Sequence, residues 1–231
     1  MIASPLESAT WFAIGPVPIS GAVVVTWGIM ASLTLASHIV TRDLHLAPSR
    51  LQAFLELIVE TLLGQIRDTM RVEPRPFLRL IGGLFVFILI ANWSSLIPGV
   101  QPPTAHIETD AALALIVFLA VIYYGVRARG VRGYLLTFAQ PTIFMVPLNL
   151  LETFTRTFSL IVRLFGNVMS GVFIVGIVLS LAGLIVPIPL MALDVLTGAI
   201  QAYIFTVLGM VFISGALNQR RMNDTGERKQ P

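Results

Sequence analysis

Four charged side chains stand inside long apolar stretches of the sequence. They are Glu152, Arg156, Arg163 and Asp194. In a membrane, a charge at mid-depth costs at least about 2.5 to 3.5 kcal/mol, so such residues need partners or water. Charged side chains of this kind are candidates for a path by which ions cross the bilayer.

Most polar side chains of the first stretch share one face of a helix. At about 100° per residue they fill a stripe about 80° wide. This polar stripe comprises Glu152, Arg156, Ser159, Arg163, Asn167 and Ser170. The next stretch repeats the pattern more sparsely, with Asp194, Gly198 and Gln201. We therefore predict two apolar helices, each with one polar face.

The depth of these residues matters as much as their face. Glu152 precedes Arg163 by about 16 Å of helix, and Asp194 precedes Gln201 by about 10 Å. One carboxylate is therefore expected near each side of the membrane, with the arginine between them. Because a mid-depth arginine would repel cations in a continuous pore, the pattern favours two aqueous half-pathways that do not join.

Structural explanations for the same residues stay open at this point. Glu152 and Arg156, four residues apart, could form a simple ion pair. The amides of Asn167 and Gln201 could hydrogen-bond to neighbouring helices, and Asp194 could cap a helix. Arg163 has no acid three or four residues away, so an ion pair within its own helix does not explain it.

The sequence predicts no cofactor or metal site. It has no cysteine, and its three histidines are isolated. No zinc spacing, glycine-rich phosphate loop or nucleophile elbow is present. We expect a chain that is not an enzyme on its own.

The composition indicates a membrane protein. Of 231 residues, 56% are hydrophobic and 12% are charged, about half the charged fraction of a soluble domain. The net charge of +3 does not indicate nucleic-acid binding, because there is one lysine and no basic and aromatic patch. The predicted fold is an all-α integral membrane domain, residues 1–231, that lies in the lipid bilayer.

The apolar segments predict about five transmembrane helices. Residues 47–72 form an amphipathic pattern, which favours a helix lying on the membrane surface. The run from 142 to 186 is about 65 Å long as a helix, twice the bilayer core, so it must tilt, begin along the interface, or break near Gly176 or Gly183. Pro187 and Pro189 then indicate a turn. The spans are 19–40, 77–97, 111–126 and the two arms of a long tilted hairpin at 142–217, followed by a polar tail at 218–231.

The arginines predict the orientation. Basic residues gather between the first two spans, in the loop at 127–132 and in the tail, whereas the loops at 98–110 and 183–189 have none. By the positive-inside rule, the N-terminus is outside and the C-terminus is cytoplasmic.

The segment Ser159–Gly171, which contains Arg-Leu-Phe-Gly-Asn, resembles the signature of subunit a of the F-type ATP synthase. Ile200–Phe205 is similar to the motif in the last helix of that family. Asn92–Gly99, followed by Pro102-Pro103-Thr104, is similar to the family's exit from the second span.

The resemblance implies a stator that faces a rotating ring of c subunits in a bacterial inner membrane. Arg163 would attract the ionised c-subunit carboxylate and block a leak between half-channels. Gln201 would face it from the last helix, and Asn167 would lie one turn further along. The implied partners are the c-ring and the membrane-anchored b subunits of the peripheral stalk, and ion flow would drive ATP synthesis or hydrolysis elsewhere in the complex.

The sequence departs from many family members at two positions. Val172 stands nine residues after the arginine, where an acid or histidine is common, so Asp194 is expected to serve the outer half-channel largely alone. Asn149 stands where many members have an acid, and Glu152 is the nearest carboxylate.

Two other classes of protein fit the sequence less well. A self-contained secondary transporter would show paired repeats and a midplane site, which the sequence lacks. A purely structural scaffold would not need the polar stripe.

Overall fold

The computed structural model describes residues 10–14, 17–42, 50–97, 100–138, 144–183 and 186–227. Residues 47–49, 98–99, 142–143, 184–185 and 228–231 of the predicted segments lie outside the described residues. In the part described, the chain is helical apart from a short hairpin of two antiparallel strands, β1 (Thr10–Ile14) and β2 (Val17–Ser20).

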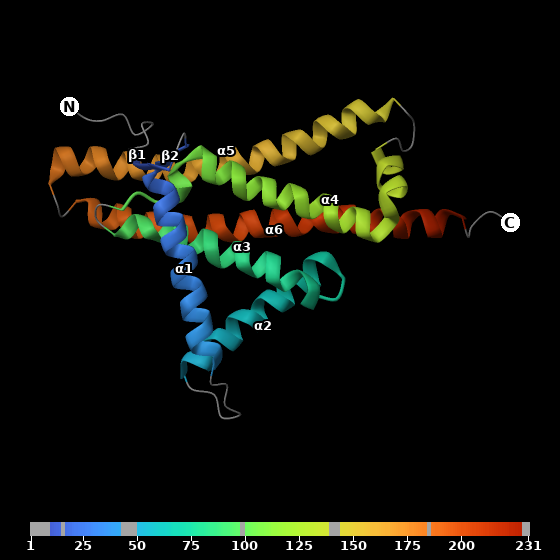
Figure 1. The fold of residues 1–231 in the computed structure, drawn as a ribbon, viewed down its shortest axis with the longest axis horizontal. Coiled ribbons are helices and arrows are strands. Elements are labelled where there is room, and N and C mark those ends of the chain that lie inside the picture. Colours follow the sequence, from blue (N-terminus) through green and yellow to red (C-terminus); the bar gives the residue numbers. More distant parts are fainter. Residues whose placement is uncertain are drawn as a thin grey trace.

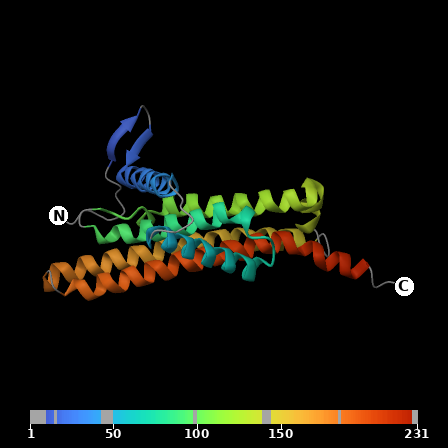
Figure 2. The same cartoon turned by 90° about the horizontal axis from the view of Figure 1, so that it is seen from below.

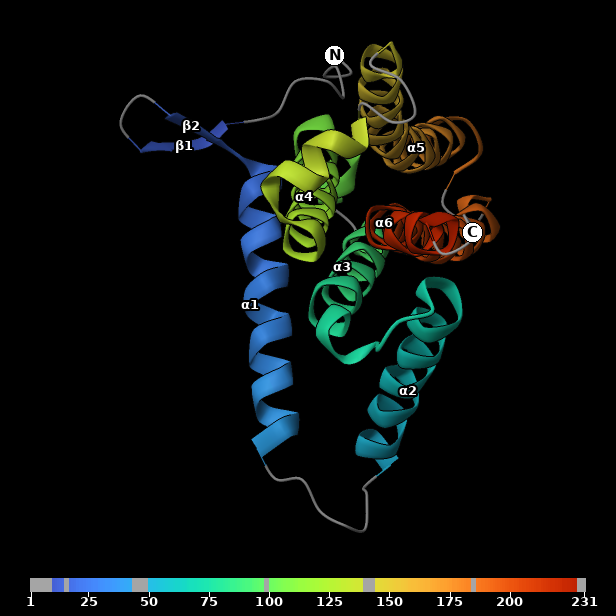
Figure 3. The ribbon, with the colours of Figure 1, turned by 90° about the vertical axis from the view of Figure 1, so that its right-hand side faces the viewer.

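Four long helices run side by side along the long axis of the molecule (Figures 1 and 2). They are α3 (Arg75–Trp93), α4 (Ile107–Phe138), α5 (Met145–Ala182) and α6 (Pro187–Glu227). Two further helices, α1 (Gly21–Arg42) and α2 (Arg50–Met70), lie crosswise to them (Figure 3). Short 3₁₀ turns, η1 (Ser94–Leu96) and η2 (Pro103–Ala105), lie between α3 and α4. We call the end that holds the α5–α6 connection the turn end, and the opposite end the C-terminal end.

Five of these helices, α1 and α3 to α6, are long and apolar enough to cross a membrane. This confirms the predicted helical membrane fold with five candidate spans. The strand hairpin was not predicted. It makes α1 begin at Gly21 rather than at Ile19, because Ile19 and Ser20 pair with β1.

Helix α4 is much longer than the predicted span at 111–126. It begins at Ile107, where Glu108 and Asp110 in the first turn suit the positive end of the helix dipole. The prediction that residues 107–110 and 127–132 are loops is therefore wrong. The second region is helical around a kink at Gly130, whose φ of 74° and ψ of 164° favour glycine.

The hairpin of α5 and α6 turns at one of the two predicted positions. Helix α5 ends at Gly183, with φ of 73°, whereas Gly176 lies inside the helix. Pro187 and Pro189 do not form the turn. They begin α6, because proline has a suitable φ and needs no N–H partner in the first helical turn. The predicted polar tail continues α6 as far as Glu227.

The lengths of the helices indicate how they fit a bilayer. The apolar segment of α1 has 20 residues, about 30 Å, which matches the membrane core when upright. The segment Met145–Leu181 of α5 has 37 residues, about 55 Å, and fits only at a tilt of roughly 55 to 60°. The crosswise arrangement of α1 and α5 suits this difference (Figure 1).

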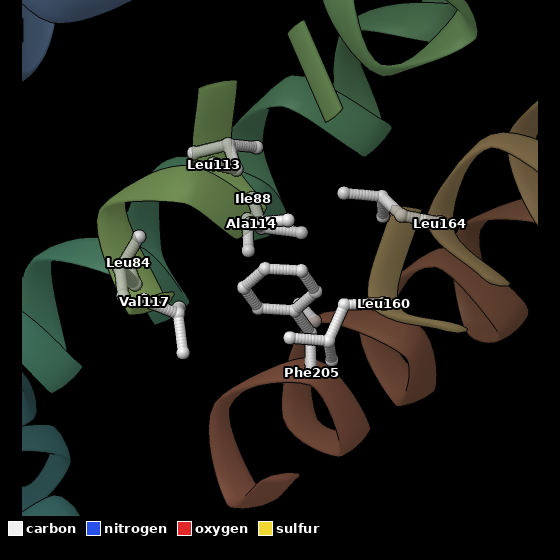
Figure 4. Packing of buried hydrophobic residues seen from close by; sticks show 9 residues of the cluster. Leu84, Ile88, Leu113, Ala114, Val117, Leu160, Leu164 and Phe205 are labelled. Atoms are coloured by element: carbon white, nitrogen blue, oxygen red, sulfur yellow. The ribbon is translucent and has the colours of Figure 1, made fainter. Parts of the chain in front are cut away.

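An apolar cluster joins the four long helices near their middle. Figure 4 shows the fully buried Phe205 ring of α6 facing Leu160 and Leu164 of α5, with side chains of α3 and α4 around it. The members of this apolar cluster are Leu84, Ile88, Leu113, Ala114, Val117, Leu160, Leu164, Ala202 and Phe205.

A second cluster, nearer the C-terminal end, holds the amphipathic helix α2. Ile66 and Met70 of α2 are fully buried against α3, α4 and α6, while Phe54 and Leu55 of its apolar face are exposed and Gln52 is buried. The amphipathic pattern thus agrees with the burial only at the C-terminal end of α2.

Candidate functional site

Arg163 lies near the middle of α5 and is exposed, although Leu160 and Leu164 beside it are 2% and 0% exposed. Among the described residues it has no hydrogen bond and no ion pair. A guanidinium within a candidate span is therefore left available to another molecule.

A groove between α5 and α6 leads from Arg163 toward the C-terminal end. It encloses about 470 Å³. Glu152 and Arg156 form an ion pair at its far end, and the Arg156 guanidinium lies over the Phe212 ring, 5.4 Å from the ring centre. This α5–α6 groove is lined by Leu148, Leu151, Glu152, Thr155, Arg156, Ser159, Leu160, Arg163, Leu208 and Phe212. It thus joins four polar-stripe residues in one water-accessible concavity.

A hydrogen-bonded network lies toward the turn end. The Ser95 hydroxyl donates to Asp194 Oδ2 over 3.2 Å. Asn92 Nδ2 donates to the Gly198 carbonyl oxygen over 2.9 Å, and Thr104 Oγ1 donates to Asn92 Oδ1 over 2.8 Å. We call these five residues the Asp194 network. It fixes the polar face of α6 against α3 and η2.

Two glycines allow the close contacts around this network. A Cβ at Gly171 of α5 would collide with the Asp194 carboxylate, and a Cβ at Gly198 would come within 3.0 Å of Asn92 Cβ. Asp194 therefore lies directly against α5, beside the residue that precedes Val172. Val172 and Asp194, which the sequence analysis assigned to the same half-channel, thus stand at neighbouring positions.

Toward the turn end, three polar side chains have buried atoms without a hydrogen-bond partner among the described residues. These atoms are both carboxyl oxygens of Asp110, Nδ2 of the half-buried Asn167, and Nε2 of Gln201. Asp110 is 0% exposed and Gln201 is 6% exposed. Sequence reasoning missed Asp110 by placing it in a loop. Its position three, four and seven residues before Leu113, Ala114 and Val117 was the available signal.

The apolar cluster separates these polar regions. Gln201 precedes Phe205 by one turn, and Asn167 follows Leu164 by one turn, both toward the turn end. The α5–α6 groove begins on the other side of the cluster. Within the described residues, the two polar regions therefore lie toward opposite ends of the hairpin, with the apolar cluster between them.

The remaining predicted residues have plainer surroundings. Ser170 is exposed and donates to the Asn167 carbonyl oxygen over 2.8 Å, within its own helix. Glu152 is exposed and forms an ion pair with Arg156. No hydrogen bond between Arg163 and Gln201 occurs in the residues that the structure describes.

Five candidate spans and a charged stripe along a long hairpin define a multi-span helical membrane protein with polar side chains in its apolar core. Comparison with known proteins gives the family. The sequence model of the family described as ATP synthase A chain matches residues 23–214. The chain belongs to the family of ATP synthase subunit a.

Relatives match over most of their length. The chain is 58% identical to ATP synthase subunit a 2 of Bradyrhizobium sp. (strain BTAi1), over 94% of this chain and 97% of the relative. It is 48% identical to ATP synthase subunit a 2 of Acaryochloris marina, over 86% of both chains. It is 41% identical to ATP synthase subunit a of Albidiferax ferrireducens, over 94% and 95%.

Proposed function

We propose that this chain is the stator subunit of a rotary ATP synthase, in which two aqueous half-paths approach Arg163 from opposite sides of the membrane. Ions that use the two half-paths drive rotation of a ring of c subunits. The chain itself performs no nucleotide chemistry, which belongs to other subunits.

The observation that carries this proposal is the apolar cluster between the two polar regions. Water and ions that reach Asn167 and Gln201 meet the buried Phe205, Leu160 and Leu164 side chains before the α5–α6 groove. An ion therefore completes its passage only when a partner carries it past the cluster. A ring of carboxylates moving along α5 is such a partner.

Arg163 provides the charge that this transfer needs. An unpaired guanidinium in a membrane is costly and favours an incoming carboxylate. Its planar fork binds a carboxylate through two hydrogen bonds. The arginine would hold each c-subunit carboxylate in its ionised form as it passes, and would repel cations that cross directly. Since one charge moving down 100 mV releases about 2.3 kcal/mol, several ions must pass for each ATP made.

The surroundings of Arg163 suit a helical partner in the membrane. The α5 surface beyond the arginine carries large exposed apolar side chains within about 100° of Arg163 around the helix. These exposed side chains include Val162, Phe173, Ile174 and Ile177. Such a surface would lie against the outer helices of the c-ring.

The family and the arginine pattern support a location and further partners for the chain. We place the chain in the bacterial inner membrane, with its N-terminus outside and its C-terminus in the cytoplasm. The α5–α6 groove then opens to the cytoplasm, and the Asp194 network faces the outside. The b subunits of the peripheral stalk complete the stator.

The test is ATP-driven ion pumping in inverted vesicles that contain the whole complex. Arg163→Ala should abolish pumping while complex abundance stays near the parental level, because the exposed arginine contributes little to folding. Arg163→Lys should also fail or nearly fail, since an ammonium lacks the planar fork. Arg127→Ala, which removes an exposed arginine from α4, is the control and should pump normally. Coupled pumping by Arg163→Ala would refute the proposal.

A self-contained transporter and a structural scaffold predict other outcomes. Either protein would purify without a ring of small two-helix subunits. Recovery of the chain with such a ring supports the stator, and its recovery alone from intact membranes counts against it.

A further inference from the structure

Asp110 is a buried carboxyl group that has no role in the ion path described above. It is 0% exposed, and neither of its side-chain oxygens has a hydrogen-bond partner among the described residues. A buried polar group of this kind is costly unless water or a cation reaches it. Glu108, two residues earlier in the same helix, is exposed.

The helical spacing fixes the depth of Asp110. Leu113, Ala114 and Val117 lie on the same face of α4 and belong to the apolar cluster. Asp110 is therefore about 6 Å, or one turn, from the cluster on the side of the turn end. Asp194 stands eleven residues before Phe205, about 16 Å from the cluster. Asp110 thus lies deeper in the path than Asp194.

Helical spacing places Asn167 and Gln201, whose amide nitrogens are also unsatisfied, at about the same level as Asp110. Asn167 lies one turn beyond Leu164 on α5, and Gln201 lies one turn before Phe205 on α6. Each has a buried amide nitrogen with no partner among the described residues. Acceptors on α4 and donors on α5 and α6 thus gather at one level. Bridging water molecules would satisfy all three.

We propose that Asp110 is a second proton-exchanging carboxyl group of the outer half-path, between Asp194 and the c-ring. This inference rests on the proposed stator function. Protonated Asp110 gives its proton through water to the c-subunit carboxylate, and the Asp110 carboxylate so formed takes a proton from water that Asp194 exchanges with the outside. Only O–H bonds break and form. The other ionisable groups in this part of the surrounding elements are His106 just before α4, Glu108 in the first turn of α4, and Asp194 and Tyr203 on α6. Arg163, Arg156 and Glu152 follow on α5 toward the C-terminal end.

The test is ATP-driven proton uptake by inverted vesicles across a pH series, expressed per assembled complex. Asp110→Asn keeps the size of the side chain but cannot exchange a proton, so uptake should fall about tenfold or more. Asp110→Glu should keep substantial uptake with an altered pH profile. Glu108→Gln is the matched control, because it removes an exposed acid from the same turn, and should behave like the parent.

A purely structural role predicts a different pattern. It would lower complex abundance but leave the rate per complex and the pH profile unchanged. If Asp110→Asn does not assemble, Asp110→Thr, which keeps a water-binding hydroxyl, should show the same loss per complex. Parental rates and pH profiles in assembled Asp110→Asn or Asp110→Thr would overturn the inference, as would an equal loss in Glu108→Gln or a loss in Asp110→Glu as large as in Asp110→Asn.

A parallel measurement on Arg163→Ala separates the two proposals. Normal pumping in Arg163→Ala would overturn the stator function itself. Loss of pumping in Arg163→Ala together with parental behaviour in Asp110→Asn would overturn only the role of Asp110.

Discussion

The two polar regions on either side of Arg163 are built differently. The α5–α6 groove is open, and its charges, Glu152 and Arg156, are exposed and paired within one helix. The Asp194 network joins α3, η2 and α6 through hydrogen bonds, and its Asn92 and Thr104 side chains are 5% and 0% exposed.

This difference predicts the positions at which substitutions should reduce the rate of ion flow. Exposed groups in a wide groove are replaceable, because water fills the space that a lost side chain leaves. Buried groups are not, because each unsatisfied partner left behind costs about 1 to 3 kcal/mol. We therefore expect large effects at the Asp194 network and, Arg163 itself apart, small effects in the α5–α6 groove.

After Arg163→Ala, the largest effect should follow Asp194→Asn. This change keeps the size and hydrogen bonding of the side chain but removes proton exchange, so ATP-driven pumping should fall about tenfold or more. Asp194→Glu should retain substantial flux. Because Asp194 lies beside Val172, adding Val172→Glu to Asp194→Asn should restore part of the rate. Parental pumping with an unchanged pH profile in Asp194→Asn would make Asp194 a structural residue.

A substitution at Gly171 should come next, because its added methyl group meets the Asp194 carboxylate. Gly171→Ala should force α5 and α6 apart locally, lowering both complex abundance and flux. Gly176→Ala is the control, since a Cβ there meets nothing within 4 Å. Immunoblots of membranes together with pumping rates measure both effects. Equal behaviour of the two variants would contradict the close contact.

A moderate effect is expected for Asn92→Ala. The variant removes the bond to the Gly198 carbonyl and leaves the buried Thr104 hydroxyl without its acceptor, which should cost about 1 to 2 kcal/mol. Thermal stability of the purified complex should fall, and pumping should fall less than in Asp194→Asn. Ser170→Ala, which loses only a contact within α5, should leave stability unchanged. No difference between the two would show that the network does not hold α3 to α6.

The smallest effect is expected in the groove. Glu152→Gln removes a carboxylate that pairs with Arg156 in an exposed position, and exposed pairs contribute about 0 to 1 kcal/mol. Pumping should remain within about twofold of the parent, which corresponds to less than 1 kcal/mol. A fall in the pumping rate as large as that in Asp194→Asn would contradict the predicted difference between the two regions.

The helices and the polar stripe could be predicted from the sequence because both depend on local spacing. Apolar length defines the spans, and the period of 3.6 residues places Arg163 and Asn167 on one face. The start of α4 was missed because Pro102, Pro103 and the acids that follow resemble a loop. Those acids instead suit a helix N-terminus.

Contacts between helices could not be predicted. Nothing local shows that Asn92 bonds to Gly198, or that Gly171 receives Asp194, because these pairs are 106 and 23 residues apart in the chain. The burial of Asp110 has the same origin, since it depends on how α4 packs against α5 and α6. The polar residues were thus visible in the sequence, while their grouping into two separate regions required the fold.

The most direct test of the two half-paths is accessibility from each side of the membrane. The chain has no cysteine, so Ser159→Cys in the groove and Ser95→Cys in the Asp194 network give two single probes. An impermeant thiol reagent is applied to right-side-out and to inverted vesicles. We predict that Ser159→Cys reacts only from the cytoplasmic side and Ser95→Cys only from the outside. Reaction of either cysteine from both sides, or of both from the same side, would contradict two half-paths separated at Arg163.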